Sequence, residues 1–402
     1  MKKIKKQDGF SLTELIVAMS VFLFVIAAAT GMFIPLIRQF KQQSTIAETN
    51  IEDTVGLELL RIDIEHAGYG LPWSFQNGNT IFNEASSSPA DSYNDGSPGF
   101  SPANPPRAIM SGDGVNFTGA NNIFNGTDYL VIKSTVVAST DTSQRWSYIT
   151  TGNNPRSWNS ENLEEGNGVI VIRPKAGETR LRQLVMSGST FSTTFVAKSF
   201  PATFSPTKSA DVYLIYGVSS SGVARLPFNR ADYYINRPAR NLPQRCANNT
   251  GVLYKATFNQ TGDTQFTELP IMDCVADLQV AYGVDITSPP DGIIDCYTNS
   301  PGKVFFPVDA QNTRDRLKEV RIYILSQEGR YDMTYTLDLN AYNTDIAPQI
   351  ECTTCIRVGE GNARNCSGEK IIGRDFDLTT IPDWQHYRWK VYTLVVRPDN
   401  LR

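Results

Sequence analysis

Apolar residues crowd together near the start of the chain, and their spacing changes further along it. The run from Phe10 to Ile37 is almost entirely apolar, and between Leu15 and Phe33 it contains no charged residue. A helix rises about 1.5 Å per residue, so roughly 20 apolar residues cross the hydrocarbon core of a bilayer. We therefore expect a membrane-spanning helix, with the span at about residues 12–34.

Beyond this run, hydrophobic residues recur at helical spacing, and charged residues, Asp53 and Asp63 among them, occupy much of the remainder. The apolar stripe consists of Ile51, Val55, Leu59 and Ile62, and it is widened by Leu57, Leu60 and Ile64. Such one-sided spacing is typical of an amphipathic helix whose stripe packs against a partner surface. The Gly- and Pro-containing segment 68–72 predicts its end. We expect one helix over residues 10–70, with its second half packed on the protein's own head.

Residues 71–127 are rich in Ser, Gly, Pro and Asn, a composition that favours loop over packed structure. From residue 128 the pattern changes to short runs rich in β-branched and aromatic residues, bounded by turn formers. The clearest runs are 129–133, 169–173, 212–216, 252–254, 275–282, 320–325 and 389–396. Helical periodicity of comparable length does not separate them, which argues against a parallel sheet. The expected fold is α+β, a long N-terminal helix followed by a mainly antiparallel, β-rich head over 128–402.

Charges at the N-terminus indicate which way the chain crosses the membrane. Lys2, Lys3, Lys5 and Lys6 precede the apolar run, and the positive-inside rule keeps such a leader in the cytoplasm. The rest of the chain then faces the periplasm or the exterior. Glu14 stands near the start of the apolar run, where a carboxylate at bilayer depth costs at least about 2.5–3.5 kcal/mol. It is a functional candidate unless it sits at headgroup level, where it would cost little.

Gly9 is followed by Phe10, by Ser11-Leu12-Thr13-Glu14 and by the apolar run. This arrangement resembles the class III signal of type IV prepilins, in which a prepilin peptidase cuts after the glycine and N-methylates the new first residue. The resemblance implies that residues 1–9 are a leader, that cleavage follows Gly9 and that Phe10 becomes the methylated N-terminus. It also implies that Glu14 pairs with the cationic N-terminus of a neighbouring subunit during assembly, where low dielectric strengthens the pair.

Three later segments, 278–285, 316–325 and 386–397, resemble late strands of PilW-type minor pilins. Together with the length of 402 residues, this implies a pilin-type helix with a β-rich head, in a minor pilin that initiates a type IV pilus or sits near its tip. The implied partners are other minor and major pilins, prepilin peptidase and, before assembly, the inner membrane. The head would first lie in the periplasm and then on the pilus surface. The alternatives are a J-type pseudopilin of type II secretion and a filament-displayed adhesin or other binding module.

Composition excludes some functions. The net charge of −4 offers no basic footprint for nucleic acid. The sequence contains no P-loop, no GxSxG elbow and no HExxH, and its two histidines stand far apart. We therefore expect no enzyme activity and no organic cofactor. Tyr213, Tyr216, Tyr233 and Tyr234 fit a core or sheet face better than a sugar-binding platform.

Six cysteines in an extracytoplasmic compartment favour disulfides. They are Cys246, Cys274, Cys296, Cys352, Cys355 and Cys366. Proximity in sequence suggests a Cys246–Cys274 bond and one bridge within Cys352 to Cys366. Zinc or a redox dithiol at Cys352-Thr-Thr-Cys355 is the less favoured alternative.

The segment 285–295 is the best metal candidate. Asp285, Asp291 and Asp295 surround a Gly turn, and oxygen-rich loops with such a turn suit calcium. Thr287 and Pro289 stand where calcium loops usually carry acidic or amide ligands. A plain Pro-Asp-Gly turn between strands explains the same residues, so calcium remains the less favoured reading.

Overall fold

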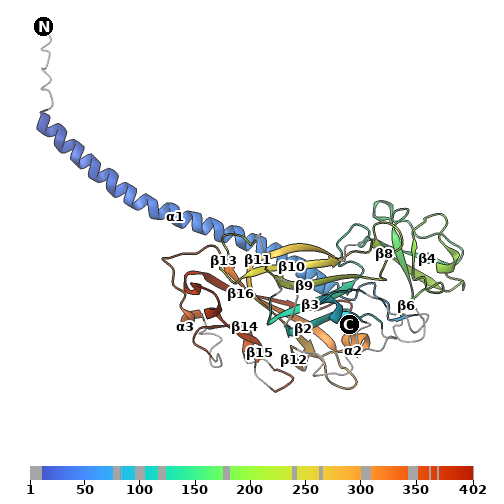
Figure 1. Cartoon of the computed structure of the whole chain (residues 1–402). Helices are drawn as coiled ribbons and strands as arrows, with labels where there is room; N and C mark the ends of the chain where they lie inside the picture. The colour runs from blue at the N-terminus through green and yellow to red at the C-terminus, as the bar shows by residue number, and fades with distance from the viewer. Residues whose placement is uncertain are drawn as a thin grey trace, which may run out of the picture. The chain divides into compact units, whose positions relative to one another are not determined.

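The structure, a computed structural model, describes residues 11–75, 82, 84–95, 105–115, 124–174, 182–237, 242–261, 266–299, 309–342, 352–361, 364–368 and 371–401. The chain divides into two compact units, residues 1–51 and 52–402. The expected N-terminal helix is present as α1 (Leu12–Glu65), which spans 54 residues and therefore contributes to both units (Figure 1). After it, the chain is mainly antiparallel β-sheet, so the expected α+β class is confirmed.

The larger sheet has eight strands and forms the centre of the second unit (Figure 1). Its order is β16 (Arg388–Val396), β13 (Leu317–Glu328), β11 (Phe266–Val284), β10 (Gly251–Phe258), β9 (Asn229–Asn236), β3 (Thr127–Ser134) and β2 (Ile109–Val115), with β12 (Cys296–Thr298) paired to β11. Every pairing given for this sheet is antiparallel.

The second sheet has six strands. Its order is β1 (Ser74–Phe75), β6 (Arg182–Leu184), β5 (Gly168–Pro174), β8 (Val212–Ser219) and β4 (Trp146–Thr150), with β7 (Ser192–Thr194) paired to β5. Strands β1 and β6 run parallel, whereas the other pairs are antiparallel. A two-stranded ladder joins β14 (Cys355–Gly361) to β15 (Ile371–Asp377). All seven runs expected as strands lie within strands of the structure.

Short helices connect these strands. They are α2 (Ala310–Arg316), α3 (Leu339–Tyr342) and 3-10 turns at Ala90–Tyr93, Asn159–Glu161, Ala202–Phe204, Leu378–Thr380 and Trp384–His386. Helix α2 begins where the Asp309 side chain accepts a hydrogen bond from the backbone N–H of Asn312 at 2.7 Å. This is the usual cap for an otherwise unpaired first-turn donor.

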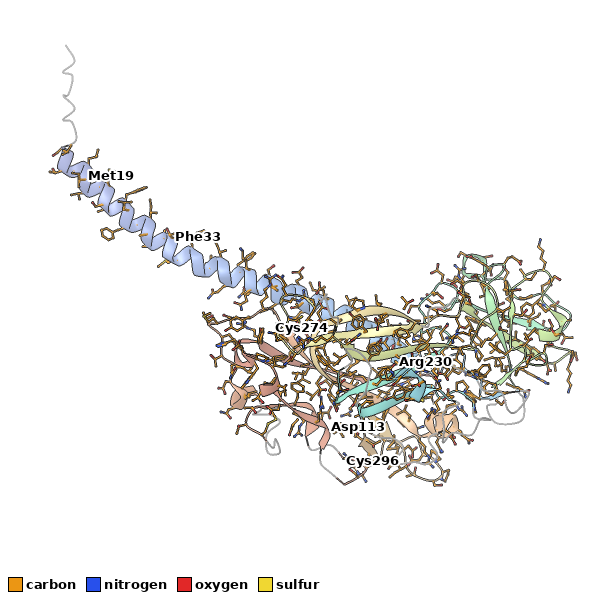
Figure 2. The ribbon with its side chains drawn as sticks, viewed as in Figure 1. Met19, Phe33, Asp113, Arg230, Cys274 and Cys296 are labelled. Atoms are coloured by element: carbon orange, nitrogen blue, oxygen red, sulfur yellow. A yellow bond between two sulfur atoms is a disulfide. The ribbon has the colours of Figure 1, made fainter. Side chains whose placement is uncertain are left out.

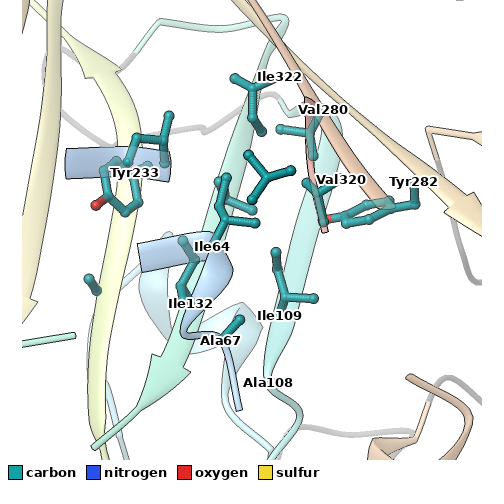
Figure 3. Close-up of a cluster of buried hydrophobic side chains, with 14 of the residues drawn as sticks. Ile64, Ala67, Ala108, Ile109, Ile132, Tyr233, Val280, Tyr282, Val320 and Ile322 are labelled. Atoms are coloured by element: carbon teal, nitrogen blue, oxygen red, sulfur yellow. The ribbon is translucent and has the colours of Figure 1, made fainter. Parts of the chain in front are cut away.

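The end of α1 is part of the main core. Leu60 and Ile64 are fully buried, and they belong to the same cluster as Ile132 of β3, Tyr233 of β9 and Val280 of β11. Figure 3 shows Ile64 lying among side chains of the surrounding strands. Burying a side chain of this size contributes about 1.5–3 kcal/mol, so the end of the helix is held firmly as part of the head.

The face of α1 that the head buries agrees only in part with the stripe expected from the sequence, since Leu60 and Ile64 of that stripe are buried as expected. Val55 and Ile62, which belong to that stripe, are 66% and 41% exposed. Asp53 and Asp63, expected on the solvent side, are buried instead. The physical reason is that these carboxylates have buried partners, such as the Lys255 ammonium beside Asp63, and paired charges can occupy a core position.

Residues 71–127 also differ from the loop expected from their composition. The described part contains the short strand β1, a 3-10 turn and the seven-residue strand β2. Glu84 is fully buried within it. The composition, rich in turn formers, did not predict that this segment is packed. Its packing depends on contacts with charged groups that lie far away in the sequence.

Candidate functional site

The first part of α1 is an apolar surface. Leu12–Phe33 form a stretch of 22 residues with a mean hydropathy of 2.4, none of it buried within the protein. At about 1.5 Å per residue, the stretch is long and apolar enough to cross a membrane. Figure 2 shows the side chains of Met19 and Phe33 on this helix. Exposed apolar side chains in such density require a membrane or other helices to cover them.

The two hydroxyls between Leu15 and Phe33 are satisfied within the helix. The Ser20 hydroxyl donates to the Ile16 carbonyl at 2.8 Å, and the Thr30 hydroxyl donates to the Ile26 carbonyl at 2.5 Å. In hydrocarbon an unsatisfied polar group costs several kcal/mol, so internal bonds of this kind suit an apolar environment. The stretch therefore presents no unmet hydroxyl to its surroundings.

Glu14 lies in the first turn of α1 and is exposed. Its carboxylate accepts a hydrogen bond from the backbone N–H of Ser11 at 3.0 Å. This arrangement satisfies one of the free donors at the start of the helix and places a negative charge at the positive end of the helix dipole. Gly9 and Phe10, the expected processing residues, lie outside the described residues. The Glu14 carboxylate is therefore held at the start of the helix, four residues after the expected N-terminus in sequence.

Asp63 connects the helix to the sheet. The Tyr233 hydroxyl donates to its carboxylate, and the Lys255 ammonium forms an ion pair with it. Burial raises the pKa of Asp63, and the positive charge of Lys255 opposes that shift. Strands β9 and β10 carry these two partners, so the pair fixes the helix against the middle of the larger sheet.

Asp53 forms a second connection. Its carboxylate accepts a hydrogen bond from the Tyr392 hydroxyl of β16 at 3.0 Å. Burial raises the pKa of Asp53 to about 6, while the hydrogen bond from Tyr392 and the charge of Arg245 act in the opposite direction. Asp53 thus holds α1 against the edge strand of the larger sheet, and Asp63 holds it against the middle of the same sheet.

A buried network of charged side chains joins residues 84–95 to strands β3 and β9. Lys133 of β3 is 2.7 Å from Glu84 and 2.6 Å from Asp95. Arg230 of β9, labelled in Figure 2, is 2.9 Å from Glu84 and 2.7 Å from Asp232. Each charge has an opposite partner and almost none is exposed, so the network fastens the segment around residues 84–95 to the sheet. Sequence reasoning missed it. Opposite charges at Arg230 and Asp232, two residues apart and next to the apolar end of β9, are the signal that could have revealed it.

The candidate calcium loop has an ordered turn. Asp285 accepts bonds from the Thr287 backbone N–H at 3.1 Å, the Thr287 hydroxyl at 2.7 Å and the Gly292 N–H at 2.6 Å. Burial opposes ionisation there, but these bonds outweigh it and lower the pKa of Asp285. Asp291 and Asp295 each accept one backbone N–H within the loop. In the described part of the chain, the three carboxylates do not gather within 4.8 Å of one another. Calcium binding here stays a prediction.

All six cysteines form disulfides, namely Cys246–Cys274, Cys296–Cys366 and Cys352–Cys355. The first pair and a bridge within Cys352 to Cys366 agree with the pairing expected from sequence proximity. Among the described residues, Cys352, Cys355 and Asp377 place potential metal-ligand atoms within 4.8 Å of one another. The two sulfurs are bonded to each other, so neither is a thiolate that zinc could bind.

The four tyrosines expected in the core are buried: Tyr213, Tyr216, Tyr233 and Tyr234. In the last two, the hydroxyl donates to a carboxylate, Asp63 and Glu268 respectively. The rings of all four tyrosines therefore pack inside the head, and the hydroxyls of the last two stabilise carboxylates by hydrogen bonds. They form no open aromatic platform.

These features define a class of protein: a β-rich head joined to an N-terminal helix whose first half is apolar enough for a membrane and whose last half belongs to the head. Within this class, the sequence pattern known as the prokaryotic N-terminal methylation motif matches residues 4–30. The motif supports a type IV pilin-like or pseudopilin protein, with pilin-family partners and processing by a prepilin peptidase. No curated protein matches the chain, and no solved structure does.

Proposed function

We propose that this chain is a minor pilin that takes part in assembling a type IV pilus, and that it initiates the filament or sits near its tip. The observation that carries the proposal is the methylation motif over residues 4–30, joined to an apolar stretch at Leu12–Phe33 that the protein itself leaves uncovered. The unit of residues 52–402 supports a tip position because repeated incorporation of so large a head would crowd a shaft. The role is structural and requires no catalytic step.

In the proposed sequence of events, the basic leader stays in the cytoplasm and α1 holds the chain in the inner membrane. The head lies in the periplasm. Prepilin peptidase removes residues 1–9 after Gly9 and methylates Phe10. The apolar half of α1 then exchanges lipid for the helices of other pilins, which removes its side chains from both water and lipid.

Glu14 supplies the specificity of this exchange. A carboxylate near the membrane core is costly, and the cationic N-terminus of a neighbouring subunit is costly there too. Bringing the two together removes both penalties, and low dielectric strengthens their attraction. The Glu14 carboxylate accepts one hydrogen bond, from the Ser11 N–H. It therefore keeps further lone pairs that can accept hydrogen bonds from the N-terminus of a neighbouring subunit.

The outer face of the second half of α1 supports lateral packing as well. Val55 and Ile62 are exposed there, although the head buries the opposite face of the same helix. Apolar residues at helical spacing on an open face fit the surface of another helix. We propose that helices of neighbouring pilins cover them in the filament.

The test is the distribution of the full chain between membranes and sheared surface filaments. A Glu14→Val chain should still be processed, but its content in the filament fraction should fall by about tenfold or more, because removing one partner of a buried charge pair costs several kcal/mol. Ser20→Val, a change one to two turns further along the same apolar stretch, is the matched control and should assemble normally.

Filament content that is the same for Glu14→Val and the native chain would contradict the assembly role of Glu14. A native chain that is processed but stays in the envelope, and whose deletion stops protein secretion while leaving pili intact, would favour the pseudopilin alternative.

A further inference from the structure

Strand β4, at the edge of the six-stranded sheet and beside β8 in Figure 1, carries an exposed aromatic cluster. Residues alternate between the faces of a strand, so Trp146 and Tyr148 share one face while Ser147 and Ile149 are buried on the other. Trp146 is 38% exposed. The ring of Trp158 lies 5.3 Å from that of Trp146, tilted by 51°, and 5.9 Å from that of Tyr148.

The rings of Trp146 and Trp158 form one wall of a hollow of about 620 Å³, which is open to solvent. Sites for small ligands typically measure about 300–1,000 Å³ and combine aromatic walls with a few polar groups. The volume of the hollow falls within this range and two tryptophans form an aromatic wall, but polar side chains make up most of the rest of its lining. Its lining consists of Asp141, Gln144, Arg145, Trp146, Trp158, Ser160 and Glu161.

The segment that carries Trp158 is held in place from within the protein. The Asn162 side chain accepts a hydrogen bond from the Trp158 backbone N–H. Arg145 donates to the Asn162 carbonyl at 2.9 Å and to the Glu164 carboxylate at 2.7 Å. A wall that is already ordered loses little entropy when a ligand binds, so the same contacts give higher affinity.

The polar groups of the hollow can both accept and donate hydrogen bonds. Asp141 and Glu161 offer exposed carboxylates, and Gln144 and Ser160 offer an amide and a hydroxyl. In the part of the chain that the structure describes, none of these four side chains has a hydrogen bond or ion pair with the protein. Hydroxyl groups are the ligand groups that match such a mixed set, because each of them donates and accepts.

We propose that this hollow binds a neutral saccharide. The apolar C–H face of a pyranose ring would stack on Trp146 and Trp158, and its hydroxyl edge would reach Asp141, Glu161 and Gln144. A cationic ligand fits less well because the Arg156 guanidinium already lies 5.8 Å from the centre of the Trp158 ring, in a cation–π position, and would repel it. The site belongs to the head alone and does not depend on the proposed role in assembly.

The test uses the full chain in a sugar-free polyoxyethylene detergent, applied to immobilised neutral oligosaccharides of glucose, galactose, mannose and N-acetylglucosamine. The native chain should bind at least one of these classes. Trp146→Ala should weaken that binding by about tenfold or more, as removal of a central aromatic contact usually does. Glu161→Gln should weaken it several-fold. Tyr331→Ala, which truncates another exposed aromatic (43%) outside the hollow, should bind as the native chain does.

Denaturant midpoints equal to the native value would show that the variants fold, as expected for side chains at the surface. Failure of the native chain to bind any of the four classes would overturn the proposal. So would binding that is unchanged in both Trp146→Ala and Glu161→Gln. Choline is the cationic probe: quenching of tryptophan fluorescence by choline that is lost in Trp146→Ala, without saccharide binding, would also overturn it.

Discussion

At the scale of single residues, charged side chains inside the head contribute to its core when every charge has a partner. Lys133 lies between Glu84 and Asp95, and Arg230 lies between Glu84 and Asp232. The desolvation of such groups costs several kcal/mol per ion, and only close opposite charges offset it. Replacement of one member should therefore be far more damaging than its own contacts suggest.

Lys133→Met tests this consequence. The substitution should lower the free energy of unfolding by about 3–5 kcal/mol, because Glu84 and Asp95 remain buried without their shared cation. Denaturant unfolding of the full chain in detergent measures it. Arg61→Met is the matched control, since Arg61 pairs with Glu58 and Glu65 on the surface of α1. It should cost about 0–1 kcal/mol, and equal losses in both variants would contradict the network's role.

Asp53 predicts a pH dependence. Its pKa rises from 3.8 to about 6 on burial. Between about pH 4 and pH 6 the folded chain therefore keeps a proton that the unfolded chain has released, and this contribution to stability is lost as the pH rises through that window. Asp53→Asn keeps an oxygen that accepts the Tyr392 hydroxyl but cannot titrate. Its unfolding free energy should fall less between pH 4 and pH 7 than that of the native chain.

Glu58→Gln is the control for Asp53→Asn because Glu58 is an exposed carboxylate of the same helix. Subtracting its pH profile from that of Asp53→Asn removes the effect of losing one carboxylate charge from this helix. Identical profiles for Asp53→Asn and the native chain would show that the buried carboxylate does not titrate differently on unfolding.

At the scale of elements, α1 has two different apolar faces in its second half. One packs into the head and includes Leu60 and Ile64, whereas Val55 and Ile62 remain outside. Gly56 lies on the inner face, where an added Cβ would collide with the backbone of Ile271 in β11. Such a close approach explains why a glycine occupies a helix interior that it would otherwise destabilise.

Leu60→Ala and Val55→Ala distinguish the two faces. Leu60→Ala should lower the free energy of unfolding by about 2–5 kcal/mol, because it leaves a cavity in a packed cluster. Val55→Ala should change it by about 0.5 kcal/mol or less, as for other surface substitutions. Thermal or denaturant unfolding measures both. A larger loss for Val55→Ala than for Leu60→Ala would reverse the assignment of faces.

The sequence allowed the long helix and seven of the sixteen described strands to be predicted, but only part of the helix face that the head buries. Runs such as 169–173 and 320–325 were recognisable because β-branched residues favour strands. Strand β9 was missed because Arg230 and Asp232 interrupt its apolar pattern. The buried face of α1 was predicted only in part: Leu60 and Ile64 lie on it as expected, but Asp53 and Asp63 lie there too, although charged residues were expected to face solvent. In each case the opposite charge or hydroxyl that stabilises the buried charged side chain lies far away in the sequence. The local residue pattern therefore carries no information about it.

Some of the candidate sites could likewise be predicted from the sequence, and others could not. Gly9, Phe10 and Glu14 were recognisable because a motif places them at fixed spacing, whereas the hollow beside β4 was missed. Its rings come from residues 146 and 158, and their proximity depends on how the segment after β4 folds back. The tyrosines that were weighed as a platform proved to be core residues.

At the scale of the whole molecule, disulfides tie distant segments of the head together. Cys296–Cys366 joins residues 70 apart, whereas Cys352–Cys355 joins residues only three apart. A cross-link limits the unfolded chain more strongly when it closes a longer loop, by about 4 kcal/mol for the first and about 2 kcal/mol for the second.

Removal of each bond by paired Cys→Ala substitution should therefore destabilise the head more for Cys296–Cys366 than for Cys352–Cys355. Denaturant unfolding of the two double variants provides the comparison. A greater loss on removal of Cys352–Cys355 would mean that the stabilisation comes from local packing and not from loop closure.

The whole chain also combines two environments, an apolar stretch suited to lipid or other helices and a head stabilised in water by a core, ion pairs and disulfides. The methylation motif at residues 4–30 supports processing by a prepilin peptidase. If the motif functions as proposed, the mature chain starts at Phe10 and keeps the apolar stretch.

Intact mass and N-terminal sequencing of the protein from membranes, with and without prepilin peptidase, test this central claim most directly. The account predicts a chain that starts at methylated Phe10 when the peptidase is present and at Met1 when it is absent. A chain that starts at Met1 in both strains would contradict it, and the protein would then be an ordinary membrane-anchored head outside the pilin pathway.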